Sequence, residues 1–217
     1  PLSAIIGENT LIEKKGKKIG FDGFWSSSLT DSTVVGKPDN ESLDFSQRLN
    51  GVDQIFEVTT KPLIMDGDTG GKVEHFEMRI KSAERLGISA LIIEDKKGLK
   101  KNSLLKDTSR QTQEGKIKFS EKISVGKKAQ ISDDFMIIAR IESFILGKGL
   151  NDAISRAHSY IEAGADGIMI HSKSKNPKEV IAFSKVFRKS YKKIPLVSVP
   201  SSYNQISEKT LYENGFN

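Results

Sequence analysis

AERLGISALIIED (residues 83–95) and IEAGADGIMIHS (161–172) are the two stretches that decide the fold. Each reads as the end of a helix, a glycine, a few small residues, a short apolar run and a polar end. An apolar run with no alternation of hydrophobic and polar residues is typical of a strand that is buried on both faces, as in a parallel sheet. The two stretches therefore predict repeated strand–helix units and an α/β protein.

More units of the same kind are visible along the chain. Further apolar runs predict strands at 20–25, 61–68, 134–142 and 193–200. Helical spacing of apolar residues predicts helices at 73–87 and 151–164, the second with Gly164 as its C-cap. Chained units of this kind form either an open doubly wound sheet or a closed (β/α)8 barrel.

Polar residues stand at the C-terminal ends of four successive predicted strands. They are Asp66 and Asp68, Glu94 and Asp95, Arg140 and Glu142, and His171 with Ser172. In a barrel these ends meet at one mouth, where barrel enzymes carry their active sites, whereas in an open sheet they spread along a crevice. The positions therefore favour a (β/α)8 TIM-type barrel.

The visible strands number six, and a barrel needs eight. The segment SAIIGENTLIEKKGKKIG (3–20) reads as a helix, and the chain ends at GFN (215–217), where the repeat requires another strand. We therefore expect a single domain over residues 1–217, a barrel fragment that lacks the first and last strands.

Composition excludes several classes of function. The chain of 217 residues has no cysteine, which removes disulfides, thiolate zinc sites, iron–sulfur clusters and thiol nucleophiles. No apolar run approaches the roughly 18 residues of a membrane span, and the N-terminus lacks the order of a signal peptide, so we expect a soluble, cytoplasmic protein. The net charge is +6, but the lysines are dispersed and aromatic residues make up only 7%, which argues against nucleic-acid binding.

Carboxylates at the predicted rim indicate a site for a hard cation. Asp66-Gly-Asp68-Thr-Gly70 puts two carboxylates two residues apart at a strand end, so both side chains can lean the same way. Together with Glu94, and with no histidine or cysteine beside them in sequence, they suit Mg²⁺ or Mn²⁺ held partly through water. The alternative is a polar turn that follows a buried strand.

Basic groups at the same rim indicate an anionic ligand. Arg140 near the end of a buried strand needs an anion, which is either a core carboxylate, Glu142 or Glu94, or the phosphate or carboxylate of a substrate. His171 shares this rim, and Trp25 stands at another strand end, where it could form a wall of the pocket.

The segment EDKKGLKKNSL (94–104) follows the strand that ends at Glu94. It is long, basic and contains a glycine, so it could close over an anion and exclude water. The alternative is a solvated loop rich in lysine.

Six segments carry a resemblance to a known family: GFDGFWSSSLTDS (20–32), GKPDNES (36–42), PLIMDGDTGG (62–71), IIEDKKGLKKNSL (92–104), MIIARIESFILGKGL (136–150) and ADGIMIHSKSK (165–175). In this order and spacing they resemble the phosphoenolpyruvate mutase family of the isocitrate lyase/phosphoenolpyruvate mutase superfamily. The resemblance implies a magnesium-dependent isomerase that interconverts phosphoenolpyruvate and phosphonopyruvate, an intramolecular phosphoryl transfer that forms a C–P bond for phosphonate biosynthesis.

The loop discriminates among members of that superfamily. Its lyases carry a catalytic cysteine in a KKCGH-type loop, and the corresponding stretch here is KKNSL (100–104), so this chain lacks that acid. Phosphonopyruvate hydrolase is the nearest alternative, with a threonine where the mutase has a loop asparagine, and Asn102 favours the mutase. An alternative of another class is a barrel that binds an anion without catalysis.

The resemblance also implies roles for single residues. Asp66 would bind Mg²⁺ directly, with Asp68 and Glu94 holding its waters. The implied substrate-binding residues are Trp25, which packs against the pyruvyl plane, Ser27 and the backbone of Ser28, which hold the carboxylate, and Ser103. The implied catalytic residues around the phosphoryl group are Asp39, Lys100, Asn102, Arg140 and His171.

Two points stay open at this stage. Asp39 matches a family aspartate that acts as nucleophile or as steering group, and Ser28 stands where the family has glycine. The superfamily swaps C-terminal helices between subunits, so the resemblance implies a homo-oligomer that acts on a small-molecule substrate, with neither nucleic acid nor membrane as a partner.

Overall fold

The structure is a computed structural model that describes residues 1–103 and 111–217. A parallel sheet of six strands forms its centre, in the order β10-β9-β8-β5-β4-β3. These strands are β3 (Phe24–Ser26), β4 (Leu63–Asp66), β5 (Ala90–Glu94), β8 (Met136–Ile141), β9 (Gly167–Ile170) and β10 (Leu196–Val197). Every neighbouring pair in this sheet is parallel, and all six predicted strands are confirmed.

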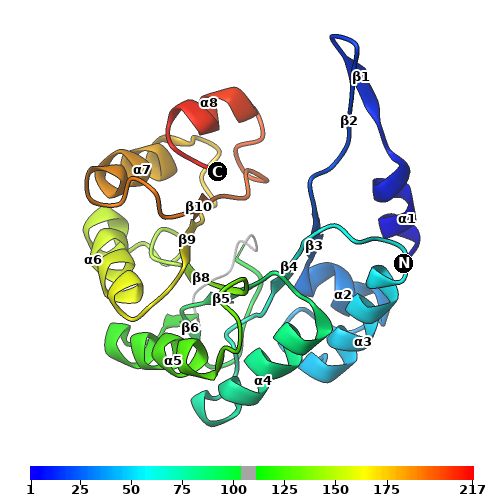
Figure 1. Ribbon diagram of the computed structural model, residues 1–217. Helices are drawn as coiled ribbons and strands as arrows, with labels where there is room; N and C mark the ends of the chain where they lie inside the picture. Colours follow the sequence, from blue (N-terminus) through cyan, green and yellow to red (C-terminus); the bar gives the residue numbers. More distant parts are fainter. Residues whose placement is uncertain (104–110) are drawn as a thin grey trace.

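Helices follow the strands and cover one face of the curled sheet (Figure 1). They are α2 (Ser28–Val34), α3 (Phe45–Phe56), α4 (Val73–Leu86), α5 (Lys116–Ala129), α6 (Gly149–Glu162), α7 (Lys178–Ser190) and α8 (Glu208–Glu213). The two predicted helices correspond to α4 and α6; the C-cap of α6 is Ala163, and Gly164 follows it with a φ of 104°. This is the arrangement of a (β/α)8 barrel, of which the described residues supply six strands.

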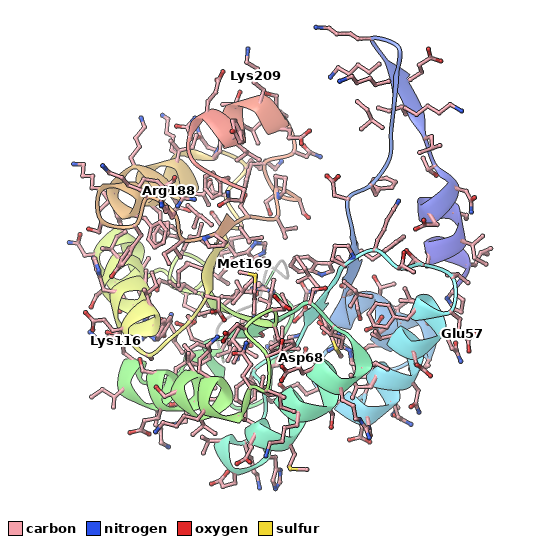
Figure 2. The ribbon with its side chains drawn as sticks, in the orientation of Figure 1. Glu57, Asp68, Lys116, Met169, Arg188 and Lys209 are labelled. Atoms are coloured by element: carbon pink, nitrogen blue, oxygen red, sulfur yellow. The ribbon has the colours of Figure 1, made fainter. Side chains whose placement is uncertain are left out.

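Both faces of the sheet are apolar, as the continuous hydrophobic runs require. Along β5, Leu91 and Ile93 pack into the large core beneath the helices. Ala90 and Ile92 point to the opposite face, where they join a smaller cluster with Met169. Met169 lies at the centre of the molecule, within the curve of the helices (Figure 2).

The prediction of a helix over residues 3–20 is wrong. Helix α1 (Leu2–Asn9) is short, and the antiparallel hairpin of β1 (Ile12–Lys14) and β2 (Lys17–Ile19) follows it. The two-residue turn has positive φ at both positions, 53° at Lys15 and 74° at Gly16, which is the conformation that matches the twist of a tight hairpin. The lysines of this segment therefore lie on a protruding ribbon and not on a helix.

A second small ribbon stands at the C-terminal edge of the main sheet. Strand β6 (Lys96–Lys97) pairs antiparallel with β7 (Thr112–Gln113), so the loop that starts after Glu94 has a hydrogen-bonded base. Leu104, the last residue of the predicted loop segment, lies outside the described residues. Within the described part of the chain, no helix combines the length and the apolarity that a membrane crossing needs.

Candidate active site

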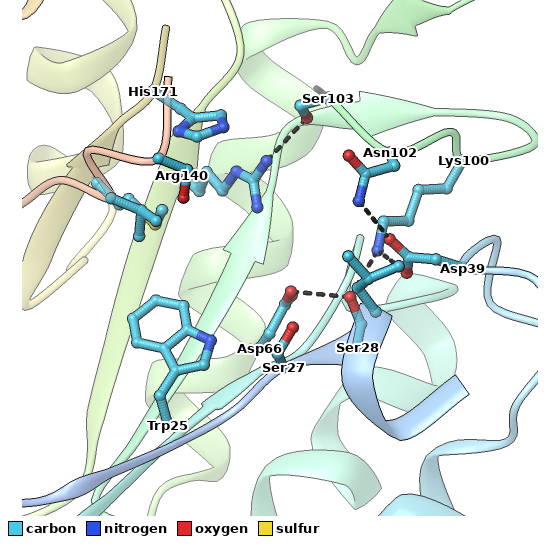
Figure 3. Close-up of a pocket in the computed structure, with 14 residues that line it drawn as sticks. Trp25, Ser27, Ser28, Asp39, Asp66, Lys100, Asn102, Ser103, Arg140 and His171 are labelled. Atoms are coloured by element: carbon cyan, nitrogen blue, oxygen red, sulfur yellow. Dashed lines mark hydrogen bonds and ion pairs between the residues drawn. The ribbon is translucent and has the colours of Figure 1, made fainter. Parts of the chain in front are cut away.

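A cavity of about 300 Å³ lies at the C-terminal ends of the sheet strands (Figure 3). Its lining consists of Trp25, Ser27, Ser28, Leu29, Asp39, Asp66, Lys100, Asn102, Ser103, Arg140, Met169, His171, Val199 and Ser201. Ten of the twelve residues predicted for the site are in this lining. The other two, Asp68 and Glu94, do not line the cavity but contact Lys100 and Arg140, which do.

Lys100 is the centre of a hydrogen-bonded group on one side of the cavity. Its Nζ donates to Ser28 Oγ at 2.9 Å and to Asp39 Oδ1 at 2.9 Å, and it also pairs with Asp68. Burial alone would lower the pKa of Lys100, but the surrounding carboxylates, Glu94 and Asp66 foremost, raise it. The side chain is therefore an ammonium ion that brings the loop down onto the cavity.

The Asp39 carboxylate accepts hydrogen bonds from two residues of the loop, Lys100 and Asn102. Besides Lys100, Asn102 Nδ2 donates to Asp39 Oδ2 at 3.0 Å, and Figure 3 shows both contacts at one end of the cavity. Burial raises the pKa of Asp39, but the charge and hydrogen bond of Lys100 outweigh it, and the net pKa is lowered. Asp39 is thus a carboxylate at neutral pH.

Arg140 pairs with core carboxylates and also faces the cavity. Its Nε donates to Glu142 Oε1 at 2.6 Å and its Nη2 lies 3.4 Å from Glu94 Oε2, so core carboxylates do pair with it. The guanidinium still lines the cavity, and Nη2 donates to Ser103 Oγ at 2.8 Å. Since the fork has more donors than these contacts use, it can also bind an anion in the cavity.

The two glutamates beside Arg140, Glu94 and Glu142, have pKa shifts in opposite directions. For Glu142, burial is outweighed by Arg140 and Lys96, and the pKa is lowered to about 2. For Glu94, burial outweighs the same two cations and raises the pKa to about 7. Glu142 accepts a hydrogen bond from Ser103 Oγ at 2.7 Å. Glu94 Oε1 accepts no hydrogen bond among the described residues, although Lys96 Nζ lies 3.3 Å from it in an ion pair. Glu94 therefore has unused capacity for a cation or its waters.

His171 directly follows β9 and is buried in the cavity wall. Burial, with a further effect of the positive Arg140, lowers its pKa to about 3. Its Nδ1 has no hydrogen-bond partner within the described part of the chain. A neutral imidazole in the cavity wall can serve a polar ligand group.

Sequence reasoning did not identify Arg48, a buried residue of α3. Its Nη1 donates to the Asp66 carbonyl at 2.5 Å and to Asp68 Oδ2 at 3.0 Å, and its Nε donates to Asp31 Oδ2 at 2.9 Å. Arg48 therefore supports the acidic turn from behind. An arginine on an otherwise core-facing stripe of a helix is the signal that could have found it.

Glu41 and Lys96 were also missed. Glu41 accepts from Thr69 N at 2.9 Å and from Thr69 Oγ1 at 2.5 Å, which ties the segment of Asp39 to the turn after β4. Lys96 donates to Ser103 Oγ at 2.5 Å and to the Lys101 carbonyl at 3.0 Å. The signal for Lys96 was its spacing of two residues from Glu94, which puts both side chains on one side of an extended chain.

The donor set is compatible with Mg²⁺ bound largely through water. Among the described residues, no group of three or more histidine, cysteine, aspartate or glutamate side chains forms a ready cage for a metal ion. Asp66 presents a carboxylate to the cavity, and Glu94 Oε1 is buried without a hydrogen-bond donor. Burial also raises the pKa of Asp68, since its two cationic neighbours do not fully offset the desolvation. One direct carboxylate with further acidic oxygens nearby fits the coordination that Mg²⁺ prefers.

Comparison with known proteins decides the family. The sequence matches the family described as Phosphoenolpyruvate phosphomutase over residues 3–217. The chain belongs to the phosphoenolpyruvate phosphomutase family. A phosphoenolpyruvate phosphomutase of Tetrahymena pyriformis is 36% identical to it over the full 217 residues, which correspond to 68% of that relative.

Hydrolases of this family are similarly close. A phosphonopyruvate hydrolase of Variovorax sp. (strain Pal2) is 37% identical over 95% of this chain and 70% of its own length. The solved structure of a phosphonopyruvate hydrolase complex with oxalate and Mg²⁺ superposes with a TM-score of 0.83 at 34% identity, over 99% of this chain and 69% of that one. Overall similarity therefore establishes the family and the fold, and the choice between the two activities depends on single residues of the site.

Proposed function

We propose that this member of the phosphoenolpyruvate phosphomutase family is a mutase that interconverts phosphoenolpyruvate and phosphonopyruvate. The observation that carries the proposal is the contact of the Asn102 amide with Asp39 in the wall of the cavity, 3.0 Å apart. An amide at this loop position supplies a donor to the phosphoryl group where the hydrolase pattern has a threonine. The full-length similarity to the Tetrahymena mutase supports the same conclusion.

The substrate carries an ionised carboxylate and an ionised phosphoryl group, and the charges of the cavity suit both. Arg140 and the ammonium of Lys100 face the cavity from two sides, and His171 adds a neutral imidazole, so three groups converge on a phosphoryl position. Trp25, Ser27 and Ser28 also line the cavity, with Trp25 on the side away from Lys100 and Ser28 beside Lys100, and this lining suits a flat pyruvyl unit and its carboxylate (Figure 3). A fork-shaped guanidinium is well matched to phosphoryl oxygens.

The residues that would hold Mg²⁺ are Asp66 directly, and Asp68 and Glu94 through water. When bound there, the ion would neutralise the negative charge that develops on the pyruvyl oxygen. Ser28 and Arg48 orient this group, because Ser28 Oγ donates to Asp66 Oδ2 at 2.9 Å and Arg48 holds the Asp66 carbonyl.

The reaction exchanges one bond of phosphorus for another. The bond from phosphorus to the enol oxygen breaks and a bond from phosphorus to the methylene carbon forms, so atoms and protons balance within one molecule. Such a transfer passes through a loose, metaphosphate-like state, and catalysis consists mainly of positioning and charge stabilisation. Arg140, His171 and Asn102 would hold the phosphoryl oxygens while the pyruvyl unit stays in place.

Water must be excluded while the phosphoryl group is loosely bound. Lys100 is 3% exposed and bonds to Ser28 and Asp39 on one side of the cavity, so the loop covers this side. Asp39 stands beside the same space, where its negative charge would steer the migrating group toward the carbon and away from other acceptors.

The alternative activity is phosphonopyruvate hydrolysis, and the observation in its favour is the 37% identity to the Variovorax enzyme. Phosphorus NMR of the protein with phosphonopyruvate and Mg²⁺ separates the two activities. Phosphoenolpyruvate as product supports the mutase, and inorganic phosphate with pyruvate supports the hydrolase. A homo-oligomeric state and a cytoplasmic location stay predictions of the sequence.

A further inference from the structure

Asp95 has no part in the mechanism above, although it follows Glu94 directly and is fully buried. Its carboxylate accepts four hydrogen bonds: from Tyr160 OH at 2.7 Å, Gln113 Nε2 at 2.9 Å and Arg156 Nη1 at 3.1 Å to Oδ2, and from the Glu142 backbone N–H at 2.9 Å to Oδ1. A buried carboxylate with this many donors is costly to assemble, and its partners show what it holds together.

The donors come from the segments that build the site. Glu142 follows the end of β8, two residues after Arg140. Gln113 belongs to β7 and pairs with Lys96 of β6, from which the chain runs directly to Lys100 and Asn102. The backbone of Asp95 joins the same segments, because its N–H donates to the Arg140 carbonyl at 3.1 Å and its carbonyl accepts from the Glu114 N–H at 2.8 Å.

Helix α6 supports this junction from the outer face of the sheet. Arg156 and Tyr160 lie one turn apart on it, and Arg156 Nη1 also donates to the Glu114 carbonyl at 2.9 Å and to Tyr160 OH at 2.9 Å. Burial and the neighbouring charge of Asp95 raise the pKa of Tyr160, so its phenol stays protonated and donates to Asp95. None of these side chains reaches the cavity lining.

We propose that Asp95 is a positioning residue, whose carboxylate fixes the end of β8 and the base of the loop so that Arg140 and Asn102 meet around one phosphoryl group. This inference rests on the proposed function. A carboxylate suits the position, because all four contacts are donated to it, whereas an amide would offer one acceptor oxygen and turn its own NH2 toward donors.

Loss of this junction has a chemical signature. A misplacement of about 1 Å in positioned groups is enough to impair a transfer that depends on alignment. If the loop base and Arg140 shift apart, water reaches the loosely held phosphoryl group. The C–P bond of phosphonopyruvate then breaks, a P–O bond to water forms and the methylene carbon takes a proton, which yields pyruvate and inorganic phosphate.

The test compares two variants of the junction with a matched control. Tyr160→Phe removes one donor and is the mild variant, and Asp95→Asn is the strong one. Tyr191→Phe is the control, because it also removes a phenol hydroxyl that contacts α6. This hydroxyl lies 2.7 Å from Nδ1 of His158, a residue of α6 outside the junction. Phosphorus NMR follows both products from phosphonopyruvate and Mg²⁺, while steady-state kinetics give kcat and KM and thermal melting reports stability.

The ratio of phosphate to phosphoenolpyruvate is the decisive quantity, because it does not depend on how much of the enzyme is folded. We expect Tyr160→Phe to lower kcat/KM about tenfold, the scale of one hydrogen bond to a charged group, and to raise the phosphate ratio and KM severalfold. Asp95→Asn should change the same three quantities, kcat/KM, the phosphate ratio and KM, more strongly. Tyr191→Phe should leave all three at their wild-type values.

Two results have distinct meanings. Wild-type ratio and KM in Tyr160→Phe, with only a lower melting temperature, would overturn the positioning role and leave Asp95 as a stabiliser of the fold. A wild-type protein that releases only phosphate would overturn the proposed mutase function instead. In that case the KM for phosphonopyruvate tests the positioning role. The role predicts a higher KM in Tyr160→Phe and an unchanged KM in Tyr191→Phe.

Discussion

Lys100 Nζ lies 2.9 Å from Asp39 Oδ1, although 61 positions separate the two residues in the chain. One partner comes from the loop after β6 and the other from the segment between α2 and α3, so the ion pair closes the cavity between two independent pieces of chain. Both side chains are largely buried, which makes the pair less sensitive to salt than a surface pair.

The first prediction concerns this pair. Lys100→Met should lower kcat/KM by at least about 10²-fold, because it removes a preorganised charge from the phosphoryl position. Lys100 is the main group that lowers the pKa of Asp39, so its removal should raise that pKa. On the acid side of the profile, the variant should therefore lose activity at a higher pH than the wild type. A pH–rate profile measures both effects. Lys97→Met, at an exposed neighbouring lysine, is the control, and equal profiles for the two variants would contradict the role of Lys100.

Asn102→Ala tests the residue to which the proposed function assigns the choice between mutase and hydrolase. We expect kcat to fall by roughly 10²-fold with a smaller change in KM, because Arg140 still anchors the substrate while one donor to the transition state is lost. Inorganic phosphate should appear as water gains access. Phosphorus NMR time courses of wild type, Asn102→Ala and the exposed control Asn151→Ala measure both products. An unaltered rate without phosphate would reduce the loop to a solvated connection.

Asp66→Ala tests the proposed metal site. Turnover should be lost, since the variant removes the single direct carboxylate ligand and leaves the charge on the pyruvyl oxygen uncompensated. Titration calorimetry with Mg²⁺ alone should show weaker binding than in the wild type, and a cooperative thermal melt of the variant separates loss of metal from loss of fold. Asp53→Ala, an exposed aspartate of α3, should bind and turn over normally. Full activity of Asp66→Ala, or of the wild type in excess chelator, would refute this site.

His171 predicts a pH dependence of stability. Its pKa is about 3 in the folded protein against 6.5 for the free side chain, so between these values the unfolded chain binds a proton that the folded chain does not. Stability should therefore fall as the pH drops from about 6.5, with a slope of up to about 1.4 kcal/mol per pH unit from this group. Urea unfolding at several pH values, with His171→Asn as reference, measures the slope. Identical slopes for both proteins would contradict a buried neutral imidazole.

The sheet was predictable because its strands are buried on both faces. Runs such as ALII (90–93) and GIMI (167–170) leave no polar position, and this pattern has few explanations other than a central parallel strand. The rim of the cavity followed from the same pattern, because all parallel strands end at one edge. Asp66, Arg140 and His171 could be assigned to one site without knowledge of any contact.

The remaining features depend on contacts that periodicity does not encode. The segment 3–20 has lysines at helical spacing, yet the turn at Gly16 makes a hairpin, since a two-residue turn with positive φ competes with a weakly amphipathic helix. Arg48 acts from a helix, and its carbonyl and carboxylate partners lie 18 and 20 positions away. Glu94 pairs with Arg140 of the neighbouring strand at 3.4 Å and does not line the cavity, a contact that the pattern of its own strand does not encode.

Trp25 is the only tryptophan of the chain, lines the cavity and is 38% exposed. All indole fluorescence of this protein therefore originates at one wall of the pocket. A ligand that fills the cavity should shift the emission maximum to shorter wavelength as water leaves the ring, and rapid mixing would then time loop closure and product release on the unlabelled protein. The site thus contains its own optical reporter, one that needs neither a dye nor a coupled assay.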